Sequence, residues 1–531
     1  MPTPALVDLV CAVFDDTYGQ VGARILRALL SDGQLSIPEL VRKTKLTPTA
    51  VQRSLVSMVT NRFVLFWHQG SKTLYYGNWK QVYRILWSGQ LLAQSEGELS
   101  DLEALKQCLL QGLVKDSPAN RPLISEKFII PVREWQFWPN EELVQSVYSK
   151  KTREIASNPE SMGKSENAQK IQVTSESQAE LERMHRMVFV NTPQNESDLL
   201  YTVNWEKFLI QSRRHEFVQF VARQIGATTA KVYEIVLRLS EHHVHSVTER
   251  RIPSSDLAVT TQQIVGQLDK ELVSEMAAVF EAGASKNGSG EEPSGKKLKS
   301  NSGEGVNVHN IKPAELVNKH LDLLMESRTA PFVQKMGNRQ GGEWFVPFDR
   351  VNEELKQNIF DEIVSQSLGE PASRLIGLIR QRGKLDEKML GNFALLPTSE
   401  IRHQMSALSC YGFADIQELA KPNERGGSGG AAGAAQKRSM FLWYHRPDWA
   451  YTRLLDLVYG QITATLKQSQ DLRREHRILL TKLSRDDVKS DINQFLTAKE
   501  LEELNEFKET ERGIFKQMNM LDRNVRIFRE Y

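Results

Sequence analysis

Apolar residues recur at helical spacing in two stretches of this chain, residues 24–63 and 374–413, which align without a gap at a constant offset of 350 positions. Gly33 and Gly383 occupy the same turn, and the apolar positions on both sides of that turn correspond. Amphipathic helices resemble one another in general. Shared turn glycines and shared helix spacing over a gapless alignment nevertheless favour a duplicated structural unit.

The first stretch predicts three helices followed by a β-hairpin. Gly33 is typical of a left-handed residue that ends a helix, and Ser36 with Glu39 forms a capping box that begins the next one. Thr47, which is followed by a proline, predicts the start of a third helix. Residues 63–76 then alternate as a strand, a turn and a second strand. Three helices and a hairpin form the winged-helix variant of the helix-turn-helix motif.

The same order of elements predicts two further winged helices. One comprises residues 351–447 and carries a Gly/Ala-rich insertion, 426–435, inside its wing hairpin. The other comprises residues 196–350 and includes residues 281–307, whose Gly, Ser, Lys and Glu content predicts a disordered insertion. Residues 80–195, which follow the first winged helix, contain no legible helix-turn-helix core. We expect a degenerate or shortened winged helix there, followed by a polar linker.

The C-terminal pattern differs in kind. A long apolar-periodic helix is predicted over residues 448–485, and Thr497 with Glu500 forms a capping box for another. Heptad spacing then predicts an apolar seam suited to docking a partner helix, made of Leu504, Phe507, Ile514, Met518, Leu521, Val525 and Phe528. We therefore expect an antiparallel coiled-coil hairpin over residues 448–531. The predicted fold is mainly α with small β-wings, in five parts: 1–79, 80–195, 196–350, 351–447 and 448–531.

Composition and net charge restrict the possible functions of this chain more than they restrict its fold. The 531 residues carry a formal net charge of only +2, whereas a free-standing nucleic-acid binder usually has a larger basic excess. The three cysteines lack the spacing of a disulfide framework or a zinc ribbon, and no apolar run approaches the roughly eighteen residues that cross a bilayer. We expect a soluble intracellular protein that does not enter a membrane.

Catalytic motifs are missing from the sequence. It contains no phosphate-binding Gly-rich loop before a lysine, no dinucleotide fingerprint after a strand and no zinc-protease or serine-hydrolase motif. His242, His243 and His245 have no second ligand cluster nearby, and Trp135, Trp138 and Trp344 are typical of packing residues. We therefore expect no catalytic residue, no cofactor and no metal.

Binding, to DNA or to other proteins, is the class of function that remains. In a winged helix the third helix can enter the major groove while the wing touches the backbone. Cations at these places, which would hold phosphates without reading sequence, are Lys43, Lys45, Arg53, Arg62, Lys72 and Arg402. The alternative is that they lie on solvated faces of domains that bind other proteins.

The order of these parts resembles a known family. The resemblance is carried by residues 9–41, 228–241, 374–413 and 444–483, the last reading YHRPDWAYTRLLDLVYGQITATLKQSQDLRREHRILLTKL. It is to the third-largest subunit of RNA polymerase III, the fungal eighty-two-kilodalton type, which is related to the alpha subunit of transcription factor IIE. No short motif is diagnostic, and residues 80–195 depart from the family's second winged helix.

The resemblance implies a non-catalytic nuclear subunit with four winged helices and a coiled coil. It further implies a heterotrimer with a second winged-helix subunit and a small acidic subunit, docked on the clamp of the polymerase III core. This subcomplex supports opening of promoter DNA, without sequence specificity, at genes for transfer RNA, 5S ribosomal RNA and other short transcripts.

Two other classes of protein stay open. A free-standing winged-helix regulator would need a strongly basic recognition helix and dimer symmetry, and neither is evident in the sequence. A scaffold of the proteasome-lid or signalosome type would place helical hairpins before a single winged helix, whereas here a winged helix comes first.

Overall fold

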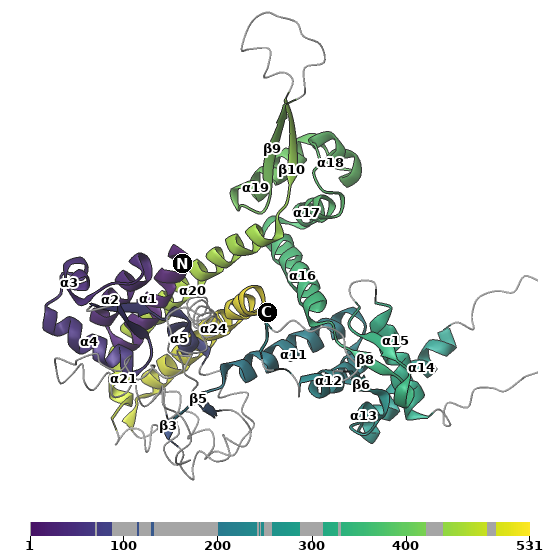
Figure 1. Cartoon of the computed structure of the whole chain (residues 1–531), viewed down its shortest axis with the longest axis horizontal. Coiled ribbons are helices and arrows are strands. Elements are labelled where there is room, and N and C mark those ends of the chain that lie inside the picture. Colours follow the sequence, from purple (N-terminus) through teal and green to yellow (C-terminus); the bar gives the residue numbers. More distant parts are fainter. Residues whose placement is uncertain are drawn as a thin grey trace, which may run out of the picture. The chain divides into compact units, whose positions relative to one another are not determined.

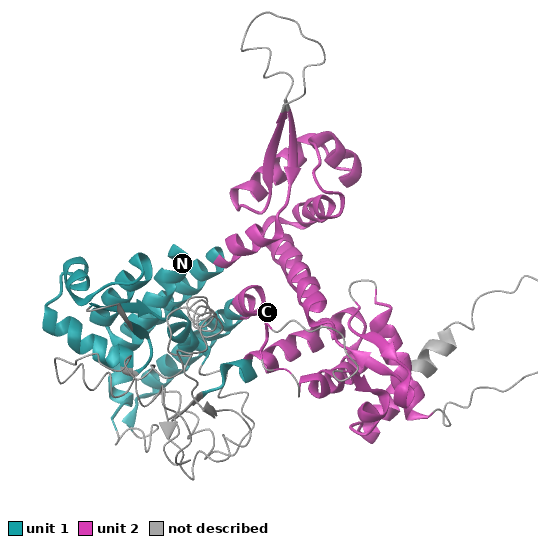
Figure 2. Cartoon of the chain, in the orientation of Figure 1, with its two compact units in different colours: residues 1–208, 456–522 teal, residues 209–455, 523–531 magenta. Residues whose placement is uncertain are grey.

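The computed structural model shows a mainly helical protein with small antiparallel sheets (Figure 1). It forms two compact units, Met1–Phe208 with Asp456–Asp522 and Leu209–Leu455 with Arg523–Tyr531 (Figure 2). The structure describes residues 2–69, 72–87, 114–115, 129–131, 200–241, 244, 246–248, 258–286, 312–327, 331–420, 439–485 and 495–531.

The first unit begins with a winged helix. Its elements are α1 (Pro4–Tyr18), α2 (Gln20–Asp32), α3 (Ile37–Thr44), α4 (Pro48–Thr60), β1 (Val64–Gln69) and β2 (Lys72–Gly77). The predicted caps are confirmed: Gly33 ends α2 at φ 83°, Ser36 and Glu39 form the capping box of α3, and Thr47 accepts from the Ala50 amide at the start of α4. These local signals set where each helix of the motif begins and ends.

The wing of this domain is tied to the helices by backbone hydrogen bonds. β1 and β2 pair antiparallel from Val64 opposite Gly77 to Gln69 opposite Lys72. Leu35, in the turn between α2 and α3, bridges to Tyr75 of β2 and so extends the sheet by one residue pair. The apolar faces of the helices meet over fully buried side chains that include Leu26 and Leu40.

The rest of the first unit contains short elements and a helical hairpin. The short elements are α5 (Trp79–Tyr83), η1 (Arg84–Trp87) and a sheet of order β3-β5-β4, with β3 at Val114–Lys115, β5 at Leu200–Val203 and β4 at Ile129–Pro131. The hairpin helices are α20 (Pro447–Glu475), α21 (Arg477–Leu483) and α24 (Ala498–Val525). The helix predicted over 448–485 is thus interrupted at His476. The unit boundaries fall within α11, α20 and α24.

The second unit contains another winged helix with a three-stranded sheet. Its elements are α11 (Trp205–Gln224), α12 (Ala227–Glu241), β6 (Val259–Thr260), α13 (Thr261–Val265), α14 (Lys270–Lys286), α15 (Pro313–Met325), β7 (Gln334–Gly337), η9 (Arg339–Gly341) and β8 (Glu343–Phe345), and the strand order is β6-β8-β7. Trp344 is buried and its Nε1 donates to Thr261 Oγ1 at 3.0 Å, which confirms its packing role. Trp135 and Trp138 lie outside the described residues.

The insertion predicted in this domain begins later than expected. Helix α14 continues to Lys286, so residues 281–286 are helical and the predicted start at residue 281 is wrong. In the first half of this helix Leu272 and Met276, four residues apart, are the buried side chains. The remainder of the predicted insertion lies outside the described residues, and with it the basic residues Lys296, Lys297 and Lys299.

The second unit ends with the duplicated winged helix. Its elements are α16 (Phe348–Leu368), α17 (Glu370–Arg382), α18 (Glu387–Ala394), α19 (Thr398–Cys410), β9 (Asp415–Ala420) and β10 (Ser439–Tyr444), with η11 (Arg526–Glu530) contacting α16. Gly383 repeats the positive φ of Gly33, at 82°, and the bridge from Leu385 to Trp443 repeats the bridge from Leu35 to Tyr75. The duplication evident in the sequence is therefore also a duplication of local structure. Residues 426–435 lie outside the described part of this wing.

Candidate nucleic-acid and protein interfaces

Four of the six predicted phosphate-binding cations are exposed on the first winged helix. Lys43 lies on α3 and forms an exposed ion pair with Asp32 at 2.6 Å. Lys45 follows α3 in a left-handed conformation, φ 56°, while Arg53 lies on the outer face of α4 and Lys72 begins β2. Exposed ion pairs contribute little to stability, so Lys43 remains available to a phosphate. These four side chains are exposed, and contact with a DNA backbone stays a prediction.

Arg62 is not available for that contact. Its side chain is buried, with 9% of the residue exposed, and its backbone has φ 61°. Burial, with a smaller effect from the neighbouring Arg84 cation, lowers the pKa of its guanidinium to about 10. The sequence held a sign of this: the equivalent position in the second copy is Gly412, which has φ 77°. Arg62 thus occupies a turn position and points inward.

Arg402, the remaining predicted cation, lies on α19 of the last winged helix. Its Nε donates to Glu387 Oε2 at 2.9 Å. The pair joins α19 to α18 and leaves about two thirds of the Arg402 side chain exposed. A phosphate would therefore compete with a carboxylate for this guanidinium.

Several residues of the predicted heptad seam pack against other residues of this chain. Leu504 packs in a cluster with Leu479 and Leu496, and the ring of Phe507 lies 5.4 Å from that of His476. Val525 and Phe528 are buried, with Phe528 5.1 Å from the ring of Tyr451 in the second unit. Three members are half-buried: Ile514, Met518 and Leu521.

Ion pairs show that the hairpin helices run antiparallel. Arg473 pairs with Glu511 at 3.0 Å, and Lys482 pairs with Glu500 at 2.8 Å. The residue number rises on one helix as it falls on the other, which is the antiparallel arrangement. The capping box at Thr497 is confirmed, since Glu500 accepts from the Thr497 amide at 2.8 Å. The coiled-coil geometry itself stays a prediction.

An acidic residue beside the seam could not be recognised from the sequence pattern. Asp522 is 2% exposed, and one of its oxygens accepts hydrogen bonds from Tyr83 Oη at 2.7 Å and Trp87 Nε1 at 2.9 Å. Trp87 also packs against Trp205 and Phe208, with ring centroids 6.1 and 5.7 Å apart. This cluster joins the chain after the first wing to the end of the hairpin. A carboxylate on the inner face of a helix is a sign that polar partners are buried with it.

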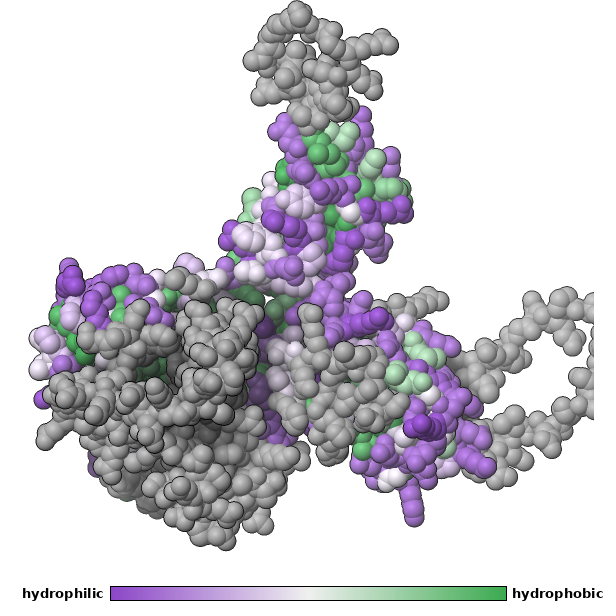
Figure 3. Space-filling model, in the orientation of Figure 1, coloured by the Kyte–Doolittle hydropathy of each residue, from purple (hydrophilic) through white to green (hydrophobic). Residues whose placement is uncertain are grey.

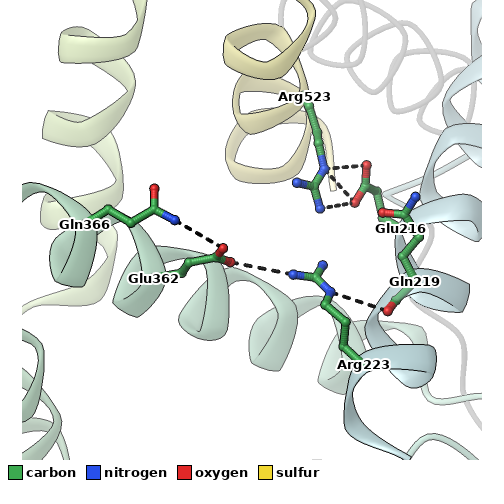
Figure 4. A network of polar contacts seen from close by, with 6 residues as sticks. All are labelled: Glu216, Gln219, Arg223, Glu362, Gln366 and Arg523. Carbon is green, nitrogen blue, oxygen red and sulfur yellow. Dashed lines mark hydrogen bonds and ion pairs between the residues drawn. The ribbon is translucent and has the colours of Figure 1, made fainter. Parts of the chain in front are cut away.

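A second buried carboxylate organises the end of the chain in the other unit. Glu216 of α11 accepts from both Nε and Nη2 of Arg523, at 2.8 and 2.6 Å, and this pairing raises the pKa of Arg523 (Figure 4). Further along α11, Arg223 pairs with Glu362 of α16 at 3.6 Å. These contacts link α11, α16 and the last turn of α24.

The part of the chain that the structure describes contains no group of three or more potential metal ligands, and none of its helices is long and apolar enough to cross a membrane. His242, His243 and His245 lie outside it. The geometry defines a protein with winged helices and a helical hairpin.

Comparison with known proteins shows similarity to subunits of RNA polymerase III. Three family models match in succession: the RNA polymerase III subunit RPC82 helix-turn-helix domain at residues 8–69, RNA polymerase III subunit RPC82 at residues 122–355, and the POLR3C C-terminal winged-helix domain at residues 360–445. Over these three segments the chain is similar to RNA polymerase III subunits. The second match begins inside residues 80–195, where the sequence showed no legible winged helix.

Fungal relatives match the chain over most of its length. It is 28% identical to DNA-directed RNA polymerase III subunit RPC3 of Yarrowia lipolytica, over 99% of this chain and 98% of that protein. It is 23% identical to the subunit of the same name from Saccharomyces cerevisiae, over 95% of this chain and 90% of that protein. The corresponding values for Candida albicans are 21%, 92% and 91%. The similarity thus extends over all the units described above.

Proposed function

We propose that this chain is a scaffolding subunit that works in transcription initiation by RNA polymerase III. The observation that carries the proposal is the succession of three family matches, all to one non-catalytic subunit, in the order of the winged helices. The relatives' names describe polymerase III subunits, which implies a nuclear location. Rigid winged helices present surfaces to partners, which is what a scaffold requires.

The finer assignment is to an initiation heterotrimer. In this proposal the chain binds a second winged-helix subunit and a small acidic subunit, docks on the polymerase clamp and aids promoter opening at genes for transfer RNA, 5S ribosomal RNA and other short RNAs. Lys43, Lys45, Arg53 and Lys72 support direct DNA contact, because they are exposed on one winged helix at the places that face a duplex. Such contacts position DNA without reading its sequence.

The experiment is affinity purification of the tagged full-length chain from a nuclear extract at moderate salt. Mass spectrometry is expected to identify the polymerase III core together with two smaller partners. Deleting residues 448–531 would be a poor test of docking, because it removes residues buried in both units, such as Asp522 and Val525, and so changes packing as well as any docking surface. A purified monomer or dimer that retains one defined DNA sequence would contradict the proposal and leave the free-standing regulator.

A further inference from the structure

The two copies of the duplicated winged helix differ in the side chains on the second helix of the motif, which are charged in the first copy and apolar in the second. Glu39, Lys43 and Lys45 of the first copy correspond, at the offset of 350, to three apolar residues in the second. These are Met389, Phe393 and Leu395. All three are exposed in the second copy, by 50%, 43% and 87% respectively. Because the folds match, the difference reflects what each surface binds, not how each domain folds.

The contact between the side chains at two of these matched positions also differs between the copies. In the first copy Lys43 pairs with Asp32 at 2.6 Å. The equivalent positions in the second copy are Phe393 and Arg382, and the Arg382 guanidinium lies 4.5 Å from the centroid of the Phe393 ring. The ring is thus held in place by a cation–π contact while a large part of it stays exposed. An aromatic residue fixed beside an arginine is typical of the centre of a protein interface.

Leu395 gives the clearest sign that this surface serves a partner. It caps α18 in a left-handed conformation, φ 54° and ψ 39°, which favours glycine or asparagine over a leucine. Its equivalent, Lys45, has nearly the same backbone angles, φ 56° and ψ 28°. A leucine here costs conformational free energy and, at 87% exposure, recovers almost none of it by burial within its own chain. Its side chain would recover that cost only against a partner.

The charges around these residues indicate what the partner carries. Both nearby carboxylates are already engaged: Asp386 accepts from the Met389 amide at 2.7 Å, and Glu387 pairs with Arg402 at 2.9 Å. Arg382 and Lys388 are exposed and, among the described residues, have no carboxylate partner. A patch of apolar side chains with uncompensated cations at its rim is complementary to an acidic amphipathic segment.

We infer that the α18 surface, defined as Arg382, Lys388, Met389, Phe393 and Leu395, docks an acidic amphipathic segment of another polymerase subunit. Green residues are visible on this winged helix over the wing strands and α18 (Figure 3). DNA is a poorer fit, because Phe393 and Leu395 replace two lysines that would bind phosphate. A second copy of this chain is a poorer fit because the surface lacks free acids to meet its own cations. The inference rests on the proposed function, since it takes the partner from the polymerase.

The test measures binding of the full-length chain to polymerase III purified from cells depleted of this subunit. The double variant Phe393→Ser, Leu395→Asn is expected to bind at least about tenfold more weakly, since central interface residues dominate affinity. The single variant Leu395→Asn keeps or raises thermal stability, because asparagine accepts the left-handed conformation, so weaker binding by it cannot be attributed to unfolding. Val21→Ser, which removes an exposed apolar side chain from α2 of the first copy, is the control that leaves polymerase binding unchanged.

A photoreactive amino acid at position 395 identifies what covers the surface in the assembled enzyme. The expected cross-link is to a peptide of another subunit that contains Asp or Glu beside apolar residues. Cross-links to DNA or to a second copy of this chain would overturn the inference, and so would no cross-link in an enzyme that contains the chain. If the unmodified chain fails to bind the polymerase, the proposed function itself is wrong. If the chain and its double variant bind equally well, only the docking surface is wrong.

Discussion

Asp522 Oδ1 lies 2.7 Å from the Oη of Tyr83, a hydrogen bond between residues at opposite ends of the sequence. The same oxygen accepts from Trp87 Nε1 at 2.9 Å, so one buried carboxylate serves two donors. Tyr83 and Trp87 are themselves fully buried. Removing the acceptor takes a buried hydrogen-bond partner from both donors, and losing such a partner is costly inside a protein.

Asp522→Ala is therefore expected to destabilise the region around α5 by about 2 to 4 kcal/mol. The measurement is hydrogen exchange of residues 79–87, whose amides should lose protection before those of α2. Glu509→Ala on the exposed face of α24 is the control and should change protection there very little. Equal protection in Asp522→Ala and the unmodified chain would show that this acceptor is dispensable.

Arg523→Ala is expected to be more harmful than a typical surface change. It leaves Glu216, whose side chain is only 5% exposed, as an unpaired buried carboxylate, and breaking such a pair costs about 3 to 5 kcal/mol. The double variant with Glu216→Gln should recover part of that loss, because the uncompensated charge is gone. Denaturant unfolding of the unmodified chain, the two single variants and the double variant gives the coupling free energy between Arg523 and Glu216. A double variant no more stable than Arg523→Ala would argue against this account.

Glu241 should make stability depend on pH in an unusual direction. Burial raises the pKa of its carboxyl to about 7, although the Arg214 guanidinium 2.7 Å away opposes the shift. Between the ordinary Glu pKa and about 7, the folded state therefore binds more protons than the unfolded state, so stability falls as pH rises through that window. Glu241→Gln removes this slope. We expect the stability of the variant relative to the unmodified chain to increase by roughly 2 kcal/mol from about pH 4.5 to about pH 7.

A constant difference in stability between the Glu241→Gln variant and the unmodified chain across that pH range would show that the Glu241 carboxyl titrates normally. Arg238→Gln is a useful companion, because this neighbouring cation on α12 is exposed and makes the smallest contribution to the pKa of Glu241. It should leave the slope nearly unchanged.

DNA affinity should depend on Arg53 but not on Arg62. Neutralising an exposed cation that contacts phosphate weakens binding to any sequence and lowers the salt slope by about 0.9 per contact. Arg53→Gln should show both effects with duplex DNA titrated at several salt concentrations. Arg62→Gln should alter stability without changing the salt slope, because its side chain is buried. Matching salt slopes for both variants and the unmodified chain would exclude DNA contact at α4.

Local chemistry explains why much of the fold was predictable. The capping box of Ser36 and Glu39, the cap at Thr47 and the glycine turn at Gly33 each depend on residues within a few positions of one another. The recurrence of the turn glycine at Gly383, with the same apolar spacing on both sides, is enough to indicate the duplicated unit. The antiparallel course of the C-terminal helices was also predictable, because a capping box follows soon after the first helix pattern ends.

Burial was much less predictable, because it depends on residues far away in the chain. Arg62 was predicted as a phosphate ligand, but packing places its side chain inside. Asp522 is buried because Tyr83 and Trp87, more than 400 positions away, donate to it. The amino-acid sequence by itself indicated the winged-helix units, their order and the family that they resemble. Only the tertiary structure decided which cations remain outside, which seam residues face their own chain and which apolar residues of α18 are exposed. The physical reason is that helix caps and periodicity are local interactions, whereas exposure is set by contacts across the whole unit.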